Sequence, residues 1–595
     1  MKWIGRVVVA VAMASAATVA HAAEGGATPV GKQVENFSLP NTHGQTVSLS
    51  DFSGKVVVLA FLGTECPLAK NYAPRLRDLA AEFAPQGVAF LAIDSNVQDS
   101  LSEMAVFAQK TELTVPLLKD NNSQLADQLG AVRTPEVFLL DQDRVVRYWG
   151  RIDDQYGQAT GTGYARPKLT ARYLADAITA VLGGHEVAQS TVSAIGCHIG
   201  RVSKVVPHGD VTYSKQVARV IQDRCVTCHR KDEVAPFTLS SYEDAVCWSE
   251  TIREVVDEAR MPPWFADPRY GHFANDARLT PAEKQVLLSW IDNGCPQGDP
   301  KDLPTPRTFV DGWQIGEPDE VHYMADAAFK LPAEGVLPYQ VYTVDPGWTT
   351  DKWIQAAECR PSNRAVVHHI LVTPKAPPGK SSSAPPFTGI AGYAPGGMPM
   401  VCPPGTATFV PAGSKLVFQM HYTPNGVVQE DRSMVGIKFV DPTTVKKLLR
   451  SSMVMNLAIR IPPGDPDYEM KAKKEVRKDF TLLELAPHMH VRGKSFKFEA
   501  DYPDGTHEVL LDVPHYDFNW QLRYILSEPK LIPKGTWLHT TAHFDNSANN
   551  PANPDPAREV TFGEQTWDEM MIGIYSSIDP KEDLTATATA EVAAP

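Results

Sequence analysis

Residues 56–70 read VVVLAFLGTECPLAK, an apolar run that leads into a cysteine and a proline. The apolar start of this stretch predicts a buried strand, and apolar spacing over 70–84 predicts a helix directly after it. Two further apolar runs, at 88–94 and 136–141, predict more strands. Strands that alternate with helices indicate an α/β sheet, which we assign to residues 28–185.

The whole chain has 595 residues, a length typical of about four domains. Hydrophobic residues make up 43% and charged residues 21%, which indicates a globular chain and argues against wholesale disorder. The formal charge of −14 argues against a nucleic-acid partner, because such proteins carry a basic surplus. The 48 prolines and 40 glycines favour architectures built from strands and turns.

The first 23 residues have the pattern of an export signal. Two basic residues are followed by an apolar run and then by Ala20-His21-Ala22, a typical cleavage site. An uncleaved membrane anchor is the alternative, but the apolar run is short for a span. No later stretch approaches the ~18 apolar residues that a membrane helix requires. We therefore expect a soluble protein without a membrane span, periplasmic or otherwise exported.

Composition divides the rest of the chain into further segments. Helical spacing and a lack of strand periodicity predict an all-α domain, whereas strand-like runs between Pro/Gly turns predict two all-β sandwiches. The predicted boundaries are a signal peptide at 1–23, a linker at 186–212, the helical domain at 213–300, a second linker at 301–320, the sandwiches at 321–445 and 446–580, and a mobile tail at 581–595.

The helical segment contains a C-x-x-C-H motif at Cys225, Cys228 and His229. Two thiols three residues apart can each form a thioether to a haem vinyl group, and the next imidazole then lies beneath the iron. A chance match, a zinc half-site or a redox disulfide are the alternatives. Met261, the only methionine between 213 and 300, is the candidate sixth ligand, and core filler is its usual role. The segment resembles a class I-like cytochrome c domain with one haem c.

Five histidines gather in three motifs of the β segments. His368 and His369 are adjacent, His421 lies in a Q-M-H-Y sequence, and His488 and His490 form H-x-H. An H-x-H pair on a strand places both imidazoles on one face. Adjacent histidines point to opposite faces unless a bulge or strand end intervenes. A hydrogen-bonded core histidine is the ordinary alternative for each motif, and zinc is the commonest metal for such clusters.

The order of these motifs, followed by a methionine in Asp568-Glu569-Met570-Met571, is more specific. It resembles the copper type II ascorbate-dependent monooxygenases, the family of peptidylglycine α-hydroxylating and dopamine β-monooxygenases. The resemblance implies two jelly-roll domains that each hold one copper and face each other across an open cleft. Its implied ligand sets are His368, His369 and His421 for the first copper, and His488, His490 and Met570 for the second.

The resemblance implies a monooxygenase that uses O2 to hydroxylate an organic substrate. The copper held by His488, His490 and Met570 would be catalytic, and the other copper would supply an electron. The haem would deliver electrons from an external donor, either a redox protein or a reductant such as ascorbate. A small organic molecule and a peptide both remain open as substrates, because no peptide-anchoring motif is recognisable.

The first segment resembles the redoxin branch of the thioredoxin fold, with Cys66 at the nucleophile position and Thr134-Pro135 as the cis-proline turn. Ala69 replaces the second cysteine of the usual C-x-x-C, so dithiol exchange within that motif is excluded. Cys66 could form a mixed disulfide or pair with Cys197. A structural or docking role for this domain is the alternative to thiol chemistry.

Two rival functions therefore stand beside the monooxygenase. One is a non-catalytic haem and copper protein for electron transfer or copper handling. The other is a thiol-disulfide oxidoreductase centred on Cys66. If the six cysteines outside the haem motif pair within their segments, the bridges would be 66–197, 247–295 and 359–402.

Overall fold

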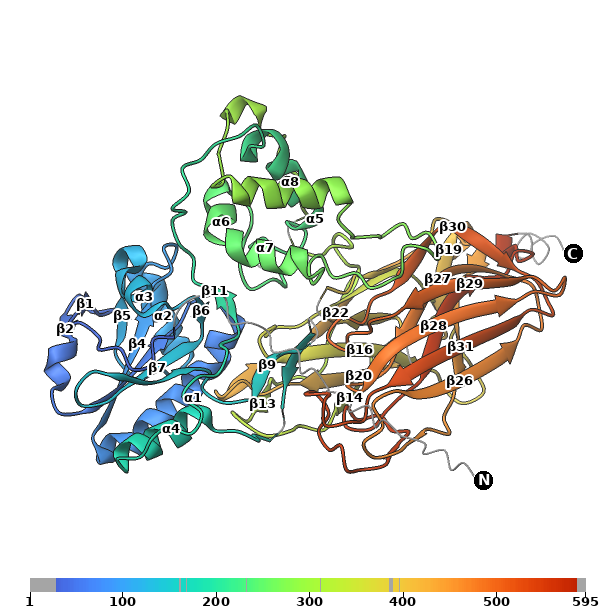
Figure 1. Cartoon of the computed structure of the whole chain (residues 1–595). Helices are drawn as coiled ribbons and strands as arrows, with labels where there is room; N and C mark the ends of the chain where they lie inside the picture. Colours follow the sequence, from blue (N-terminus) through green and yellow to red (C-terminus); the bar gives the residue numbers. More distant parts are fainter. Residues whose placement is uncertain are drawn as a thin grey trace, which may run out of the picture.

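The computed structural model describes residues 28–585 except 160, 161, 167, 232, 311, 385–388 and 395. The predicted signal peptide at 1–23 lies outside the described residues. Figure 1 shows an α/β part (blue), a helical part (green) and a large β part (yellow to red), with the helical part above the junction of the other two. The chain is thus multidomain, as the composition predicts.

The α/β part is built on a five-stranded sheet in the order β5-β4-β3-β7-β8. Its central strand carries Val56, Val58 and Ala60 on one face, while the residues between them face a second core. Burial on both faces explains why this strand reads as an unbroken apolar run. The sheet strands are β3 (Val56–Phe61), β4 (Val88–Asp94), β5 (Leu117–Lys119), β7 (Glu136–Leu140) and β8 (Val146–Gly150).

Helices cover both faces of this sheet, so the predicted α/β domain is confirmed. Strands β3, β4 and β5 are parallel, and β7 and β8 run antiparallel to their neighbours. The other elements of this part are β1 (Ser38–Pro40), β2 (Thr46–Ser48), α1 (Pro67–Phe83), α2 (Leu101–Lys110), α3 (Gln124–Leu129), β6 (Arg133–Thr134), β9 (Tyr156–Ala159), β10 (Thr162–Ala165) and α4 (Tyr173–Leu182).

The segment predicted as a linker, 186–212, contains a short strand, β11 (Cys197–His198). This strand pairs antiparallel with β6, and the backbone N–H of Ile199 donates to Val132 O at 2.9 Å. Gly196 allows the close approach, because a Cβ at this position would lie 2.0 Å from Thr134 O. The segment therefore returns to the α/β part before it enters the helical part.

The helical part contains η4 (Tyr213–Val217), α5 (Ala218–Arg224), α6 (Tyr242–Cys247), α7 (Ser249–Asp257) and α8 (Pro281–Asp292). The helical character predicted for 213–300 is confirmed, and α6 and α7 are divided at Trp248. Capping boxes at Ser241 and Thr280 begin α6 and α8, since each side chain accepts the N–H three residues later. The fully buried Trp290 lies in the core of this part.

The loop between α7 and α8 corrects the predicted domain boundary. Trp264 and Phe273 pack in the core of the second sandwich, with ring centroids 4.9 and 5.5 Å from that of Tyr524. The backbone N–H of Ala274 donates to Ile525 O at 2.8 Å. Part of the segment 213–300 therefore belongs by its packing to the β part.

The first sandwich closes its core between two sheets, as expected for an all-β domain. Its larger sheet contains β12 (Glu320–Tyr323), β15 (Lys352–Arg360), β18 (Met400–Val401), β19 (Thr406–Val410), β22 (Met434–Phe439) and β23 (Lys447–Leu448). The facing sheet contains β14 (Gln340–Val344), β16 (Val367–Lys375), β17 (Ala391–Tyr393) and β20 (Lys415–Tyr422), and β13 (Phe329–Leu331) pairs with β21 (Gln429–Asp431). Because β23 pairs with β19, the first sandwich extends past the predicted boundary at 445.

The second sandwich has two four-stranded sheets around its own core. One sheet contains β24 (Arg450–Met455), β27 (Phe480–His488), β30 (Tyr524–Ile532) and β33 (Ile572–Ile578). The other contains β26 (Tyr468–Glu475), β28 (Gly493–Asp501), β29 (His507–Val513) and β31 (Trp537–Phe544), and β25 (Arg460–Ile461) pairs with β32 (Val560–Thr561).

The start of the predicted mobile tail is held against the sandwiches. The Glu582 carboxylate pairs with Arg450 at 2.5 Å and accepts the N–H of Leu448 at 2.7 Å. The N–H of Leu584 donates to Lys446 O at 3.0 Å. The chain is therefore anchored through residue 584, beyond the predicted start of the tail at 581.

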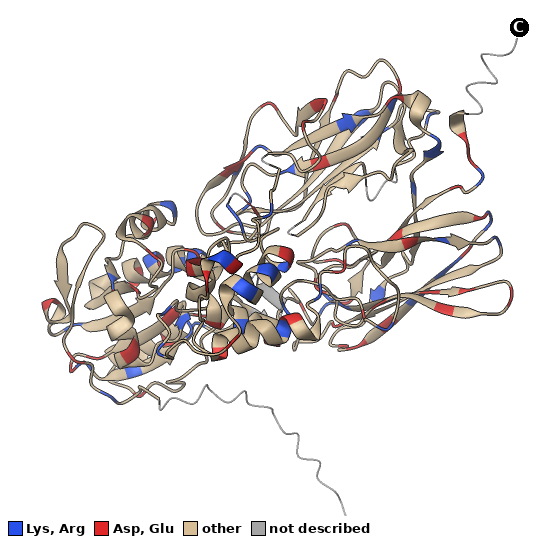
Figure 2. Cartoon of the chain, turned by 90° about the horizontal axis from the view of Figure 1, so that it is seen from above, with Lys and Arg blue, Asp and Glu red and all other residues tan. Residues whose placement is uncertain are grey.

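The surface carries both signs of charge throughout. Figure 2 shows acidic and basic residues interspersed along the α/β, helical and β parts. Within the described residues, no helix combines the length and the apolar character needed to cross a membrane.

Replacing Trp264 tests whether the loop between α7 and α8 stabilises the second sandwich. We expect Trp264→Ala to lower its free energy of unfolding by about 3–5 kcal/mol, because the substitution empties a buried site. Differential scanning calorimetry of the full chain would show the sandwich transition at a lower temperature. Leu457→Ala, at a side chain 50% exposed, is the control and should change stability by less than about 0.5 kcal/mol. Equal effects of the two substitutions would contradict this role.

Candidate functional sites

Three of the predicted ligands meet in the first sandwich. His368 and His369 lie on β16, and His421 lies on the neighbouring strand β20. The pairing register shifts between Val367 and His369, and His369 then lies directly opposite His421. An irregularity of this kind is what adjacent histidines need in order to face one site.

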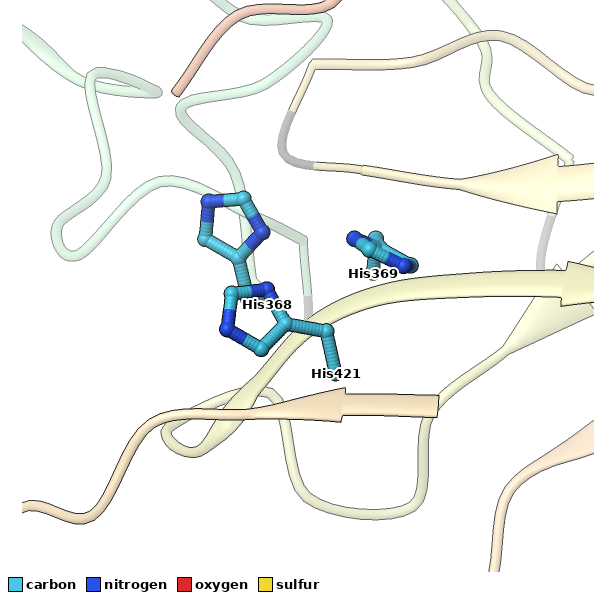
Figure 3. Close-up of side chains that lie close together, drawn as sticks. All are labelled: His368, His369 and His421. Carbon is cyan, nitrogen blue, oxygen red and sulfur yellow. The ribbon is translucent and has the colours of Figure 1, made fainter. Parts of the chain in front are cut away.

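The three imidazoles form a compact cluster, drawn in Figure 3. Ring centroids are 4.7 Å apart for His368 and His421, 5.1 Å for His369 and His421, and 5.9 Å for His368 and His369. One nitrogen from each ring lies within 4.8 Å of the others. Imidazoles at such distances can converge on one metal ion.

The surroundings of this cluster fit a metal better than a hydrogen-bonded core. Both ring nitrogens of His368 and Nδ1 of His421 are shielded from solvent without a hydrogen-bond partner in the described structure. Buried polar atoms rarely stay unpaired, which points to a missing ligand. Burial lowers the pKa of His368 to about 4 and also lowers the pKa values of His369 and His421. The rings are therefore neutral at pH 7, the form that binds metal.

The H-x-H pair lies at the end of β27 in the second sandwich. The ring centroids of His488 and His490 are 5.3 Å apart. His488 Nδ1 lies 2.8 Å from Oε1 of Gln521, and His490 Nδ1 lies 3.2 Å from Asp568 O. These partners favour Nδ1–H on both rings and leave Nε2 as the ligand atom, an arrangement typical of metal-binding histidines.

Glu569 connects Met570 to the H-x-H turn. Its fully buried carboxylate accepts the backbone N–H of His490 at 2.9 Å and that of Arg492 at 2.7 Å. Met570 is buried and directly follows this carboxylate along the chain. The structure thus holds the backbone segment of Met570 beside the turn that carries both histidines, while coordination by its thioether stays a prediction.

Phe518, from the loop between β29 and β30, contacts imidazoles of both histidine sets. The Phe518 ring stacks on His368, with centroids 4.9 Å apart and planes 12° apart, and its centroid lies 6.1 Å from that of His490. Thr566 Oγ1 of the second sandwich lies 3.4 Å from Nε2 of His421. The open cleft implied by the family resemblance is therefore absent between these residues, because the sandwiches are in contact.

Several residues of this centre carry no motif of their own. Phe518, Gln521 and Tyr339 lie in loops, and the Tyr339 ring packs 5.0 Å from that of His369. Gln419, in contrast, was visible two residues before His421 on the same strand, and its Oε1 lies 3.4 Å from His369 Nε2. Strand periodicity could find Gln419, but loop residues offer no such signal.

The C-x-x-C-H motif follows α5 directly. The N–H groups of Cys228 and His229 donate to Cys225 O at 3.1 and 2.9 Å, so the three residues share one turn. His229 Nδ1 lies 3.1 Å from Phe237 O, which leaves Nε2 as the free ring nitrogen. Both thiols are unpaired, and burial lowers the pKa of His229. The motif thus fits covalent haem attachment.

Met261 lies just after α7, where its N–H donates to Val255 O at 3.1 Å. This position is three residues before Trp264, which packs in the second sandwich. The axial-ligand role of Met261 stays a prediction.

In the α/β part, Cys66 is the N-cap residue of α1 and is only 1% exposed. Its thiol donates to Thr134 O at 2.9 Å, and the Thr134-Pro135 bond is cis, as predicted. Burial raises the pKa of Cys66, but hydrogen bonds from Cys197, Thr134 and the Ala69 N–H outweigh burial and lower it to about 6. The start of a long helix favours a thiolate in the same direction.

All eight cysteines are free thiols in the structure. None of the three predicted bridges, 66–197, 247–295 and 359–402, is therefore formed in it. Cys66 and Cys197, in contrast, are brought together from segments more than a hundred residues apart.

Glu254 of α7 joins the helical part to the α/β part. Its Oε2 lies 2.8 Å from His198 Nε2 and 2.7 Å from Arg133 Nη2. Arg260 pairs with the other carboxylate oxygen. Burial raises the pKa of Glu254, but the hydrogen bonds from His198 and Arg133 outweigh it and hold the pKa at about 2. This carboxylate is therefore ionised throughout the neutral range.

Comparisons with known proteins match the α/β part. A model of the AhpC/TSA family matches residues 30–149. The thiol-disulfide oxidoreductase ResA of Geobacillus kaustophilus is 32% identical over 121 residues, which are 20% of this chain and 68% of that protein. ResA of Bacillus thuringiensis subsp. konkukian is 29% identical over 114 residues, 19% of this chain and 65% of its own length. The chain thus spans about two thirds of these relatives.

Solved structures give similar matches. A hypothetical protein from Sinorhizobium meliloti 1021 is 30% identical and covers 29% of this chain and 95% of its own, with a TM-score of 0.26. Peroxidoxin BcpB from Mycobacterium tuberculosis is 29% identical and covers 21% of this chain and 85% of its own, with a TM-score of 0.19. The redoxin-type, thioredoxin-like nature of the N-terminal domain is confirmed by the family match. The copper and haem assignments depend on motifs and geometry.

Neutralising Glu254 tests the junction between the α/β and helical parts. The folded pKa of about 2 lies below the ordinary value of 4.5, so the stabilisation is complete above pH 4.5 and disappears as the pH falls towards 2. We expect Glu254→Gln to lower the free energy of unfolding by about 1–2 kcal/mol at pH 7 and by less near pH 3, because the unfolded chain is then largely protonated at this position. Urea unfolding at both pH values measures this difference.

The matched control is Glu258→Gln, because Glu258 pairs with the same Arg260 but is 54% exposed. It should change stability by less than about 0.5 kcal/mol. A loss for Glu254→Gln that is equal at both pH values would contradict the role of its charge.

Proposed function

The chain belongs, through residues 30–149, to the AhpC/TSA family, and we propose that this redoxin domain is one part of an exported, multidomain oxidoreductase. Its catalytic centre would be a pair of copper sites in the two sandwiches. The enzyme would hydroxylate a small organic molecule or a peptide with O2, adding one oxygen atom to a C–H bond and reducing the other to water with two external electrons and two protons.

One observation carries this proposal: two histidine sets from separate sandwiches meet around Phe518. The cluster of His368, His369 and His421 offers three close imidazoles, and both ring nitrogens of His368 and Nδ1 of His421 are buried without a hydrogen-bond partner in the described structure. His490 of the H-x-H pair contacts the same Phe518 ring that stacks on His368. A hydrogen-bonded core would leave fewer buried nitrogens unpaired.

The residues of the centre have separable tasks. His488, His490 and Met570 would hold the copper at the substrate side, and the first cluster would hold the other. Copper, when bound, supplies the one-electron steps that hydroxylation with O2 requires. Gln521 and the Asp568 carbonyl fix the ring orientations of the H-x-H pair. The neutral state of the imidazoles keeps their nitrogens available at pH 7.

Electrons would reach the centre through the helical part. Cys225, Cys228 and His229 would bind one haem c, with Met261 as the other axial ligand. The loop that begins at Met261 enters the second sandwich at Trp264, which supports delivery to this sandwich. The external donor would be a redox protein or a reductant such as ascorbate.

Metal and haem analysis of the full chain tests this proposal. We expect about two coppers and one haem per chain, and about one copper fewer in His369→Ala. Met570→Ala should lower O2-dependent hydroxylation at least about tenfold, because the thioether ligand is lost. His322→Ala is the control, since His322 lies in the first sandwich and pairs with Glu320 instead.

Zinc in place of copper, or a Met570→Ala variant as active as wild type, would contradict the proposed centre. Two coppers and one haem without O2 consumption coupled to an oxidised product would instead favour a non-catalytic carrier of electrons or copper.

A second candidate function is thiol-disulfide exchange at Cys66. It is favoured by the similarity of this domain to proteins named as thiol-disulfide oxidoreductases. The position of Cys66 at the start of α1 and its lowered pKa also suit a nucleophilic thiol. This activity would accompany the copper chemistry, because the two centres lie in different domains.

Cys66→Ser separates the two functions. We expect the reduction of insulin disulfides by the reduced chain to fall at least about 100-fold, because the attacking thiolate is lost. Copper content and hydroxylation should stay unchanged. Cys402→Ser, at a buried thiol of the first sandwich, is the matched control and should retain insulin reduction. An unchanged rate in Cys66→Ser would rule out Cys66 as the nucleophile.

A further inference from the structure

Cys197 occupies a defined place beside Cys66. On β11 it lies directly opposite Thr134 of β6, and the Cys66 thiol is bonded to the carbonyl of that same Thr134. Cys197 also packs against the core cluster that contains Cys66. A residue from the segment after the α/β domain thus comes next to the predicted nucleophile.

The backbone at Gly196 allows β11 to lie close to β6. Gly196 has a φ of +136°, and a Cβ there would lie 2.0 Å from Thr134 O and 3.3 Å from Pro135. Only glycine therefore allows β11 to lie this close to β6. The Arg133 guanidinium also donates to Gly196 O at 2.9 Å, which fixes the turn before Cys197.

The two thiols differ in acidity in a way that suits two roles. Burial raises the pKa of Cys66, but its hydrogen bonds lower it to about 6 overall. The pKa of Cys197 is raised well above its ordinary value, first by its hydrogen bond to Cys66 and then by burial. At pH 7 Cys66 is the attacking thiolate and Cys197 keeps its proton.

Cys197 also belongs to the packing of two domains. Its side chain packs against the core around α1 and against the core of the helical part. The next residue, His198, bonds to Glu254 of α7, and its N–H donates to Thr251 Oγ1 at 3.2 Å. A bond between Cys66 and Cys197 would therefore join the redoxin domain covalently to the segment that holds the helical part.

We propose that Cys197 is the resolving thiol for Cys66, and that the pair exchanges two electrons with a disulfide in a partner protein. The inference deepens the second candidate function and rests on nucleophilic chemistry at Cys66. The second cysteine of the C-x-x-C pattern is Ala69 in this chain, and Cys197 from a distant segment would take the role of that cysteine.

The exchange balances in two steps. The Cys66 thiolate attacks one sulfur of the partner's disulfide, and the other sulfur leaves and takes a proton from water. Cys197 then loses its proton and attacks Cys66 Sγ, so the Cys66–partner bond breaks and the Cys66–Cys197 bond forms. The partner leaves as a dithiol that has gained two electrons, and an external dithiol reverses the reaction.

Access to Cys66 requires movement of β11, because Cys66 is 1% exposed beneath it. The pairing of β11 with β6 involves two residues on each strand. Such a short pairing can open locally without unfolding either domain.

A single-turnover reaction of the reduced full chain with oxidised glutathione tests the proposal, with peptide mass spectrometry as the readout. We expect wild type to form the 66–197 disulfide and to release two glutathione molecules per chain. Cys197→Ser should stop at a glutathione adduct on Cys66. Cys247→Ser, at a thiol of α6 near this junction, is the matched control and should behave like wild type.

Gly196→Ala keeps both thiols and should form the adduct on Cys66 but resolve it at least about tenfold more slowly, because its Cβ displaces Cys197. The proposal would be overturned if Cys197→Ser released glutathione from the Cys66 adduct at the wild-type rate, or if Cys66 formed a disulfide with Cys247. An absence of any adduct on Cys66 in all variants would instead contradict the nucleophilic function on which it rests. Circular dichroism of each variant checks that the fold is retained.

Discussion

The stacking of Phe518 on His368 crosses from the second sandwich to the first, and the proposed centre depends on this contact between the two histidine sets. The ring contacts imidazoles of both sets, and nitrogens of His368 and His421 are buried without a hydrogen-bond partner in the described structure. The sandwiches are also tied by Tyr339, whose N–H donates to Gln565 Oε1 at 3.1 Å. Two domains of ordinary sandwich construction thereby create a polar but sheltered centre that neither contains alone.

Regular elements were accessible from the sequence, because burial on a strand or helix face leaves a period in the apolar residues. The helices of the middle segment followed from such periods, and the strand at 56–61, buried on both faces, followed from its unbroken apolar run. The ligand histidines were accessible for a related reason, since short motifs on strands imply which side chains share a face. Even the bulge at His369 followed from the geometry of neighbouring strand residues.

The contacts that the sequence did not predict are made by segments that pack against another domain. Trp264 reads as part of a Pro-rich loop, and nothing in its neighbourhood has a period that would assign it to the core around Tyr524, more than two hundred residues later. Phe518 and Gln521 also lie in a loop, where the sequence has no period that would assign them to the histidine centre. The strand at Cys197 has two residues, too few for any pattern, and its position depends on the space left by a glycine. The packing of loops and very short strands against distant segments depends on tertiary contacts alone, so the local sequence gives no signal for it.

The docking of the loop between α7 and α8 bears on how the protein can be divided for laboratory use. A shortened chain that begins after residue 300 would keep every copper-ligand candidate but lose Trp264, Ala266 and Phe273 from the core of the second sandwich. The apolar side chains of that core would then face water, and exposed patches of this kind promote self-association. Expression of the β part alone is therefore a question of solubility first, and the shortest well-behaved fragment should begin before the helical part.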